Sequence, residues 1–310
     1  MRRIAVRAPC STSNLGPGFD VFGMALNILY DIVEVEIVEE NGVFLSVEGV
    51  GADRIPTDPE KNSAGKAALE FLKRYGLAGV KVKLKKGIPA GSGLGSTGAS
   101  AGATVFAMNR LLRTGLDKRS LVEIAAQGEI ATAGSPHADN VAPSICGGVT
   151  IISSYEPLRV TWFPPPKGLI FSVAVPQGIE KTTKGARAVL PRAVRLSKVI
   201  RNLGSSSLVL AGLLHSDARL LGEGMMGDVI VEPERISLYP GCVDAKRAAI
   251  EVGAAGATLS GAGPAMIAVT DPKSADPHEV ADAMKQAFIA KGIACESYVG
   301  RSTSGARVIG

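Results

Sequence analysis

The segment KLKKGIPAGSGLGSTGASAGATVFAMNRLL, residues 83–112, constrains the fold of this chain most strongly. Lysines alternate with apolar residues over 79–85, six glycines follow between Gly87 and Gly102, and an apolar row at helical spacing closes the segment. This order predicts a strand, a loop almost without side chains, and a helix. Amides of such a loop and of the helix start face one point. The segment therefore favours a phosphate-binding site over glycines that only allow close helix packing.

Two well-known loop motifs fit this segment less well. The P-loop pattern requires a lysine in the loop, and residues 87–98 contain none. The dinucleotide pattern G-x-G-x-x-G matches residues 93–98, but it also requires an acid at the end of a second strand about 20 residues later. Asp117 and Glu123, the acids in that region, open or lie in a predicted helix. We therefore expect backbone amides to hold the phosphate, with added hydroxyls from Ser92, Ser96 and Thr97.

Glu129 continues the apolar row of the helix that begins at Asp117, after Leu121 and Ala125. A buried carboxylate without a partner costs several kcal/mol or shifts its pKa. A magnesium ion shared with nucleotide phosphates would remove that cost. A nearby lysine, or a position at the edge of the apolar row, would avoid it. The sequence leaves these three arrangements open.

Composition places the chain among globular proteins with a substantial core. Of its 310 residues, 46% are hydrophobic and 20% are charged, and the net charge of +5 permits an anionic ligand without requiring one. Cys10, Cys146, Cys242 and Cys295 lack metal-ligand spacing, which indicates reduced thiols. No stretch has the length of a signal-peptide core or a membrane span. We expect a cytoplasmic protein with no membrane partner.

Hydrophobic patterning predicts helices and strands without regular alternation. Asp58 is the expected N-cap of a helix that ends at Gly76, and two more helices follow the glycine loop and Asp117. In the first half of the chain, strands are predicted at 2–9, 31–38, 43–50, 79–85, 148–154 and 158–163. The strand at 43–50 could pair with the strand at 31–38.

Three consecutive prolines in WFPPPKG, residues 162–168, mark a linker. The mixture of elements on both sides of it favours two α+β domains, residues 1–165 and 166–310, over a doubly wound sheet. In the second half the predicted elements are a strand at 169–175, several helices, two short strands within 256–270, a helix near 277–291 and a strand near 294–300.

Three motifs carry a family resemblance: APCSTSNLGPGFDVFGMAL (8–26), GIPAGSGLGSTGAS (87–100) and GATLSGAGPAMIAV (256–269). In this order they resemble the GHMP small-molecule kinases, and SNLGPGFD in the first motif resembles the homoserine kinase branch. HADNVAPSICGG (137–148) and SYEPL (154–158) extend the likeness over essentially the whole chain. The resemblance implies an N-terminal domain like ribosomal protein S5, a C-terminal ferredoxin-like domain and an active site between them.

The resemblance also implies an activity and its ligands. It implies phosphorylation of the side-chain hydroxyl of L-homoserine from ATP and Mg²⁺, in threonine biosynthesis. Thr97, where the family usually has serine, and Glu129 are the implied magnesium ligands. A homodimer is one assembly state that the sequence leaves open. The implied ATP-binding residues are Asn62, Pro89, Ala90, Gly91, Ser92, Gly93, Leu94, Gly95, Ser96, Thr97, Gly98 and Ala99.

An amino-acid substrate needs guanidinium groups for its carboxylate and acids for its ammonium. By resemblance, Arg187 and Arg235 match the carboxylate positions, and Asp20 and Asp139 match the acidic positions. Asn14 and His137 accompany them to orient the hydroxyl.

We expect catalysis without an obligatory side-chain base, because phosphoryl transfer depends mainly on in-line positioning and charge neutralisation. The usual catalytic aspartate of the superfamily has no clear match in this chain. Catalytic roles are assigned to Asn14, Asn140 and Glu129, with Asn140 holding the hydroxyl in line.

Three other functions remain open at this point. Another GHMP kinase would phosphorylate mevalonate, shikimate or a similar alcohol, but the paired arginines and acids favour an amino acid. An RNA-binding protein would use the lysine face of residues 81–86, yet no aromatic residue lies among those lysines to stack on bases, and we expect no nucleic-acid partner. A nicotinamide-dependent oxidoreductase would depend on the G-x-G-x-x-G match alone.

Overall fold

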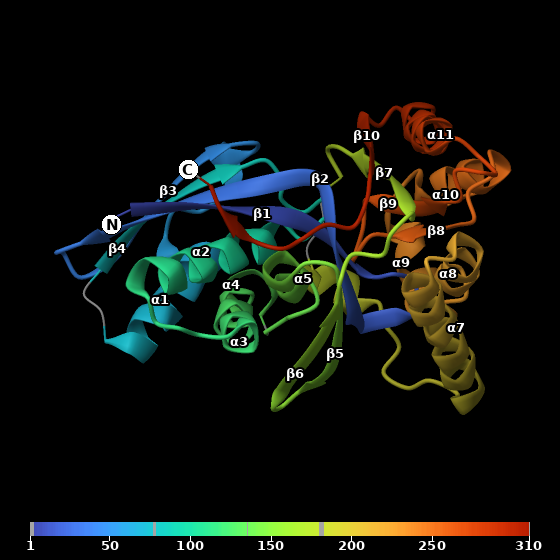
Figure 1. The fold of residues 1–310 in the computed structure, drawn as a ribbon. Helices are drawn as coiled ribbons and strands as arrows, with labels where there is room; N and C mark the ends of the chain where they lie inside the picture. The colour runs from blue at the N-terminus through green and yellow to red at the C-terminus, as the bar shows by residue number, and fades with distance from the viewer. Residues whose placement is uncertain (1–2, 77–78, 135, 180–182, 310) are drawn as a thin grey trace.

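Two β-sheets with helices packed on them make up the computed structural model, which describes residues 3–76, 79–134, 136–179 and 183–309 (Figure 1). The seven-stranded sheet has the strand order β11-β1-β2-β4-β3, with β5 paired to β2 and β6 paired to β5. The four-stranded sheet has the order β10-β7-β9-β8. The predicted α+β class is confirmed.

Helices cover one face of the larger sheet (Figure 1). Its strands are β1 (Arg3–Asn14), β2 (Gly18–Val38), β3 (Gly42–Gly49), β4 (Gly79–Lys86), β5 (Val149–Tyr155), β6 (Leu158–Phe163) and β11 (Arg307–Val308). The associated helices are η1 (Ala52–Arg54), η2 (Pro59–Lys61), α1 (Ser63–Tyr75), α2 (Ser96–Leu112), α3 (Lys118–Gly128), α4 (Ile130–Ala133) and α5 (Val141–Cys146).

The smaller sheet follows the β-α-β-β-α-β arrangement of ferredoxin-like domains, as the resemblance implied. Its strands are β7 (Ile170–Pro176), β8 (Gly256–Leu259), β9 (Met266–Thr270) and β10 (Cys295–Gly300). The accompanying helices are α6 (Thr183–Ala188), α7 (Leu196–His215), α8 (Ala218–Met225), α9 (Glu232–Arg235), η3 (Ile236–Leu238), α10 (Cys242–Glu251) and α11 (Pro277–Ile289).

The residue pattern explains the elements that lead to the glycine loop. In β4, Val80, Val82 and Leu84 are buried while the intervening lysines are exposed, as a period of two requires. This apolar row packs with α1 and α2 in one core. That core continues into the smaller sheet through Phe171 and Ile267, so the two sheets share buried contacts.

Two expectations about local structure are wrong. The strand at 43–50, observed as β3, pairs in parallel with β4 and not with β2, because β2 is already paired to β1 and β4 there. Asp58 caps the short helix η2, while the α1 N-cap is Asn62, whose side-chain oxygen accepts from the amides of Ala64 and Gly65.

Both N-terminal strands are longer than predicted, since β1 reaches Asn14 and β2 begins at Gly18. The start of the predicted strand at 2–9, Arg2, lies outside the described residues. The end of the chain runs back along the larger sheet, where Val308 pairs with Val6 of β1 (Figure 1). The domain division at residues 165 and 166 stays a prediction.

The helices within the described ranges include none with the length and apolar character needed to cross a bilayer.

Candidate active site

The glycine loop between β4 and α2 forms one wall of a cavity of about 310 Å³. Gly91, Gly93 and Gly95 have φ values of 72°, 92° and 65°, a backbone conformation that favours glycine. A Cβ on Gly93 would lie 2.5 Å from the carbonyl oxygen of Ser260. The loop thus needs glycine for its turns and for its close approach to the turn between β8 and β9.

The start of α2 carries amides that the protein leaves available. Gly95, the N-cap residue, provides no side-chain cap. In the described chain, the amides of Ser96, Thr97 and Gly98 have no hydrogen-bond acceptor. The positive end of the helix dipole lies at the same place, so the helix start is suited to a phosphate group.

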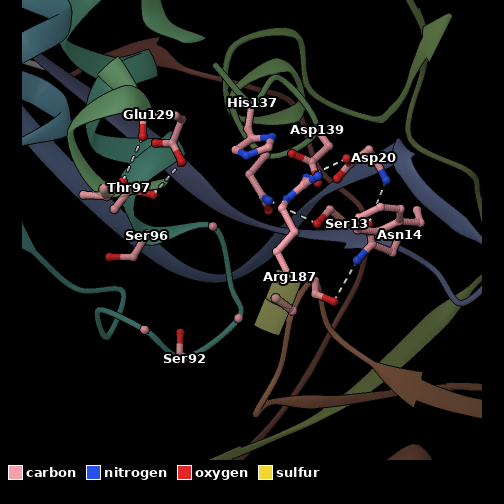
Figure 2. A pocket seen from close by; sticks show the side chains of 18 of the residues that line it. Ser13, Asn14, Asp20, Ser92, Ser96, Thr97, Glu129, His137, Asp139 and Arg187 are labelled. Carbon is pink, nitrogen blue, oxygen red and sulfur yellow. Dashed lines mark hydrogen bonds and ion pairs between the residues drawn. The ribbon is translucent and has the colours of Figure 1, made fainter. Parts of the chain in front are cut away.

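Two of the three loop hydroxyls hold the loop in shape. The Ser92 hydroxyl donates to the Pro89 carbonyl over 2.8 Å, and the Ser96 hydroxyl donates to the Ile88 carbonyl over 2.9 Å. Thr97 differs, because its hydroxyl donates to Oε2 of Glu129 over 3.0 Å (Figure 2). Thr97 and Glu129 therefore form a pair of oxygen groups beside the free amides.

Glu129 is the C-cap residue of α3, one position beyond the helix end. Its side chain is buried, and its Oε1 atom has no hydrogen-bond partner. Burial raises the pKa of Glu129 to about 7, while the Thr97 hydrogen bond opposes that shift. A buried carboxylate oxygen without a hydrogen-bond partner, at the wall of a cavity with free amides, is suited to bind a cation. Of the three arrangements left open, the exposed edge position is not observed, and within the described part of the chain no lysine lies at ion-pair distance from Glu129.

The opposite wall carries charged groups from both halves of the chain (Figure 2). An Arg187 guanidinium nitrogen lies 2.6 Å from Oδ2 of Asp20. The guanidinium groups of Arg187 and Arg235 lie 5.1 and 4.8 Å from the centre of the Phe19 ring. The Phe19 ring thus contacts two guanidinium groups that line the same cavity.

Arg235 is 2% exposed, and its Nε donates to the Ala186 carbonyl over 2.9 Å. Burial lowers the pKa of Arg235, and the Arg187 charge adds to that effect. No carboxylate within the described residues lies at ion-pair distance from it. The rest of its guanidinium fork is therefore suited to an incoming carboxylate.

Asn14 joins the first and third motifs. Its amide nitrogen donates to the Gly261 carbonyl over 2.7 Å, and its amide oxygen accepts from the Asp20 amide over 3.1 Å. Asn14 and Asp20 have φ values of 71° and 59°, so the backbone is strained where it enters the cavity. These bonds fix where Asp20 meets Arg187.

Asp139 is buried beside the same space. Burial raises the pKa of Asp139, the Asp20 charge raises it further, and a hydrogen bond from Ser13 opposes the shift. Asn140 donates to the Ser13 hydroxyl over 3.1 Å and accepts from the Ser11 hydroxyl over 3.0 Å. The side chain of Asn140 is thereby fixed at the cavity wall.

Five predicted site residues do not line the cavity. Asn62 caps α1, and Leu94 is fully buried in the core. The others outside the lining are Pro89, Gly98 and Ala99. Fifteen of the predicted residues line it, and sequence reasoning missed Ser13, Phe19, Thr132, Gly261 and Ala262. Four of the missed residues lie within the first and third motifs, whereas Thr132 carries no sequence signal.

Comparison with known proteins matches this chain to one family. The profile of the GHMP kinases N terminal domain matches residues 62–148, and that of the GHMP kinases C terminal domain matches residues 209–290. The homoserine kinase of Methanocella arvoryzae is 40% identical over 310 residues, covering 100% of this chain and 98% of the relative. That of Methanococcus vannielii is 39% identical, with 93% and 94% covered.

A solved structure gives the same result in three dimensions. The crystal structure of homoserine kinase from Cytophaga hutchinsonii superposes with a TM-score of 0.91 and 38% identity. The superposition covers 100% of this chain and 98% of the other.

Proposed function

The chain belongs to the homoserine kinases of the GHMP family, and we propose on this ground that its cavity transfers the γ-phosphoryl group of ATP to the side-chain hydroxyl of L-homoserine in threonine biosynthesis. One observation supports the proposal most directly. The free amides at the start of α2 and the charged groups Asp20, Arg187 and Arg235 border the same cavity. A phosphate donor and a zwitterionic acceptor would therefore meet there.

The phosphate side follows from the backbone. The first-turn amides of α2 would donate to triphosphate oxygens, and the glycine loop would lie against the same group without side-chain obstruction. Of the loop hydroxyls, Thr97 is placed for a further ligand, because Ser92 and Ser96 donate within the loop.

A magnesium ion fits the oxygens of Thr97 and Glu129. Oε1 of Glu129 has no protein partner, and the described residues contain no group of three or more His, Cys, Asp or Glu side chains that could hold a metal by themselves. Magnesium usually takes one or two protein ligands and completes its shell with phosphates and water, which suits such a sparse set. When bound there, it would neutralise charge on the phosphate oxygens.

The substrate side accounts for both charges of an amino acid. Arg187 and Arg235 would bind the carboxylate, and Asp20 and Asp139 would attract the ammonium. Asp20 and Arg187 bind each other in this structure, so the substrate would replace one ion pair by two. Mevalonate has no ammonium and would leave the acids unpaired.

Catalysis is proposed to depend on position and charge. Asn14 and Asn140 are held by hydrogen bonds at the cavity wall and would keep the hydroxyl in line with the phosphate. A loose transition state requires little proton removal before bond formation, so no obligatory base is assigned. We further propose that the protein acts in the cytoplasm, because its four cysteines are buried free thiols.

His137→Ala is expected to remain active, with kcat lowered by about tenfold or less. His137 lines the cavity, but a group that only orients the hydroxyl contributes less than a base on which the reaction depends. The measurement is kcat with saturating ATP and L-homoserine, together with the affinity for L-homoserine. A near-total loss of turnover with homoserine binding intact would contradict catalysis without a base.

ADP release with ATP and Mg²⁺ tests the substrate proposal. We expect release with L-homoserine, and at least about 100-fold lower kcat/KM with L-serine, mevalonate and shikimate. L-Serine keeps the charges but moves the hydroxyl, whereas mevalonate and shikimate lose the ammonium. Activity with mevalonate but not with homoserine would overturn the substrate while leaving the kinase chemistry in place.

A further inference from the structure

We propose that Lys86, which does not line the cavity, is a positioning residue for the triphosphate: its buried ion pair with Asp31 fastens both ends of the glycine loop and so fixes the direction of the α2 amides. This inference rests on the proposed function.

The positions of Lys86 and Asp31 follow from strand register. Lys86 continues the buried row of Val80, Val82 and Leu84 in β4, so it points into the core and not toward solvent. Ile32 of β2 pairs with Lys85 of β4, which places Asp31 and Lys86 side by side at the next step. Their side chains are 1% and 3% exposed. A buried charge pair of this kind is costly unless its hydrogen bonds are complete.

The ammonium of Lys86 uses all three of its donors. It donates to Oδ2 of Asp31, to the Ser100 hydroxyl over 2.7 Å and to the Ser96 carbonyl over 3.1 Å. Ser96 is the first residue of α2 and Ser100 lies one turn later. Lys86 therefore holds the inner side of the helix start, while the amides of that turn face the cavity.

Asp31 fastens the other end of the loop. Its Oδ1 accepts from the amides of Gly87 and Ile88, each over 3.0 Å. The Ser96 hydroxyl then donates back to the Ile88 carbonyl, which joins the two loop ends directly. One ion pair thus connects the loop entry, the loop exit and two strands, and none of its side-chain atoms lacks a partner.

The ion pair makes hydrogen bonds that packing of the core alone does not require. Replacing a buried ion pair by apolar groups of similar volume is often neutral or stabilising, so an apolar pair at positions 31 and 86 would satisfy packing. It would not fix the Ser96 carbonyl or the Gly87 and Ile88 amides. Without these bonds the first turn of α2 would adopt several orientations, so its amides would bind phosphate less tightly.

The double variant Lys86→Met with Asp31→Leu tests this, since it removes both charges together and so leaves neither an unpaired buried ammonium nor an unpaired buried carboxylate. We expect it to fold and to bind ADP about 10- to 100-fold more weakly than wild type by isothermal titration calorimetry. The KM for ATP should rise in parallel, while the KM for L-homoserine changes by about threefold or less. Lys83→Met is the matched control, because Lys83 lies in the same strand but forms an exposed pair with Glu48.

The outcomes separate the two proposals. Equal ADP affinity in the double variant and wild type would overturn the positioning role, as would an equal rise of both KM values. Wild-type protein that does not bind ADP would overturn the proposed function and this inference with it. If the double variant does not fold, Ser100→Ala decides, because it keeps the ion pair but loses the hydroxyl that accepts from Lys86 and donates to Asp31. An ADP affinity lowered by about two- to fivefold is expected, whereas an unchanged affinity would contradict the proposal.

Discussion

Glu129→Gln is expected to lower kcat about 1,000-fold and, at about pH 8, to make the ligand-free protein more stable than wild type. The first effect follows from the proposed magnesium site. Glutamine keeps the shape of the side chain and an oxygen for Thr97, but it removes the negative charge beside the cavity. A loss of about 4 kcal/mol in transition-state stabilisation corresponds to that factor.

The stability effect follows from the pKa of Glu129, which burial raises from 4.5 to about 7. The folded protein holds this proton more tightly than the unfolded chain does. The stabilising contribution of Glu129 is therefore complete below about pH 4.5 and disappears as the pH rises through about 7. The change amounts to on the order of 3 kcal/mol in the free energy of unfolding. Glutamine has no such proton, so the variant should lack this pH dependence.

Urea unfolding of wild type and Glu129→Gln between about pH 4.5 and pH 8, without nucleotide, measures the second effect. Glu123→Gln is the matched control, because Glu123 lies in the same helix and is half exposed in an ion pair with Arg74. Identical pH profiles for wild type and Glu129→Gln would contradict the raised pKa of Glu129 and show that another group already stabilises its carboxylate.

The sequence predicts the glycine loop and the fold around it because local pattern determines them. Alternation over β4, helical spacing after Ser96 and a glycine at each positive φ of the loop are properties of neighbouring residues. The parallel pairing of β3 with β4 is different. Alternation indicates that a strand exists but does not identify its partner, and β2 was the nearer choice in sequence.

The site is predicted less completely, because its residues compete for the same hydrogen bonds. Ser92 and Ser96 read as phosphate ligands, yet both hydroxyls bind carbonyls of their own loop, a common use of serine near turns. The lysine face of residues 81–86 includes Lys86, but Lys86 lies two residues after Leu84 and therefore belongs to the buried face of β4. Phe19 is uncharged and matches no pattern for a ligand-binding residue. It joins the site because the fold brings both arginines to its ring.

Arg235→Met is expected to raise the KM for L-homoserine about 100-fold or more without lowering the melting temperature. The guanidinium offers charge-assisted bonds to the substrate carboxylate, each worth about 1.5–3 kcal/mol. The same group is buried, lies beside the like charge of Arg187 and has a pKa that burial lowers. An apolar side chain of similar length should therefore be tolerated by the fold.

The comparison of two substrates makes this prediction specific to the carboxylate. The KM for ATP should stay within about twofold of wild type, since Arg235 lies at the Phe19 ring beside Arg187, among the groups proposed to bind the amino acid. Arg235→Lys should recover little of the loss, because an ammonium cannot keep the bond to the Ala186 carbonyl and also present a fork to the substrate. Arg247→Met, at an exposed position of α10, is the control. A parallel rise of the KM for ATP, or a fall in melting temperature that accounts for the lost activity, would assign Arg235 to the fold instead. A group that binds only L-homoserine should change neither the KM for ATP nor the melting temperature.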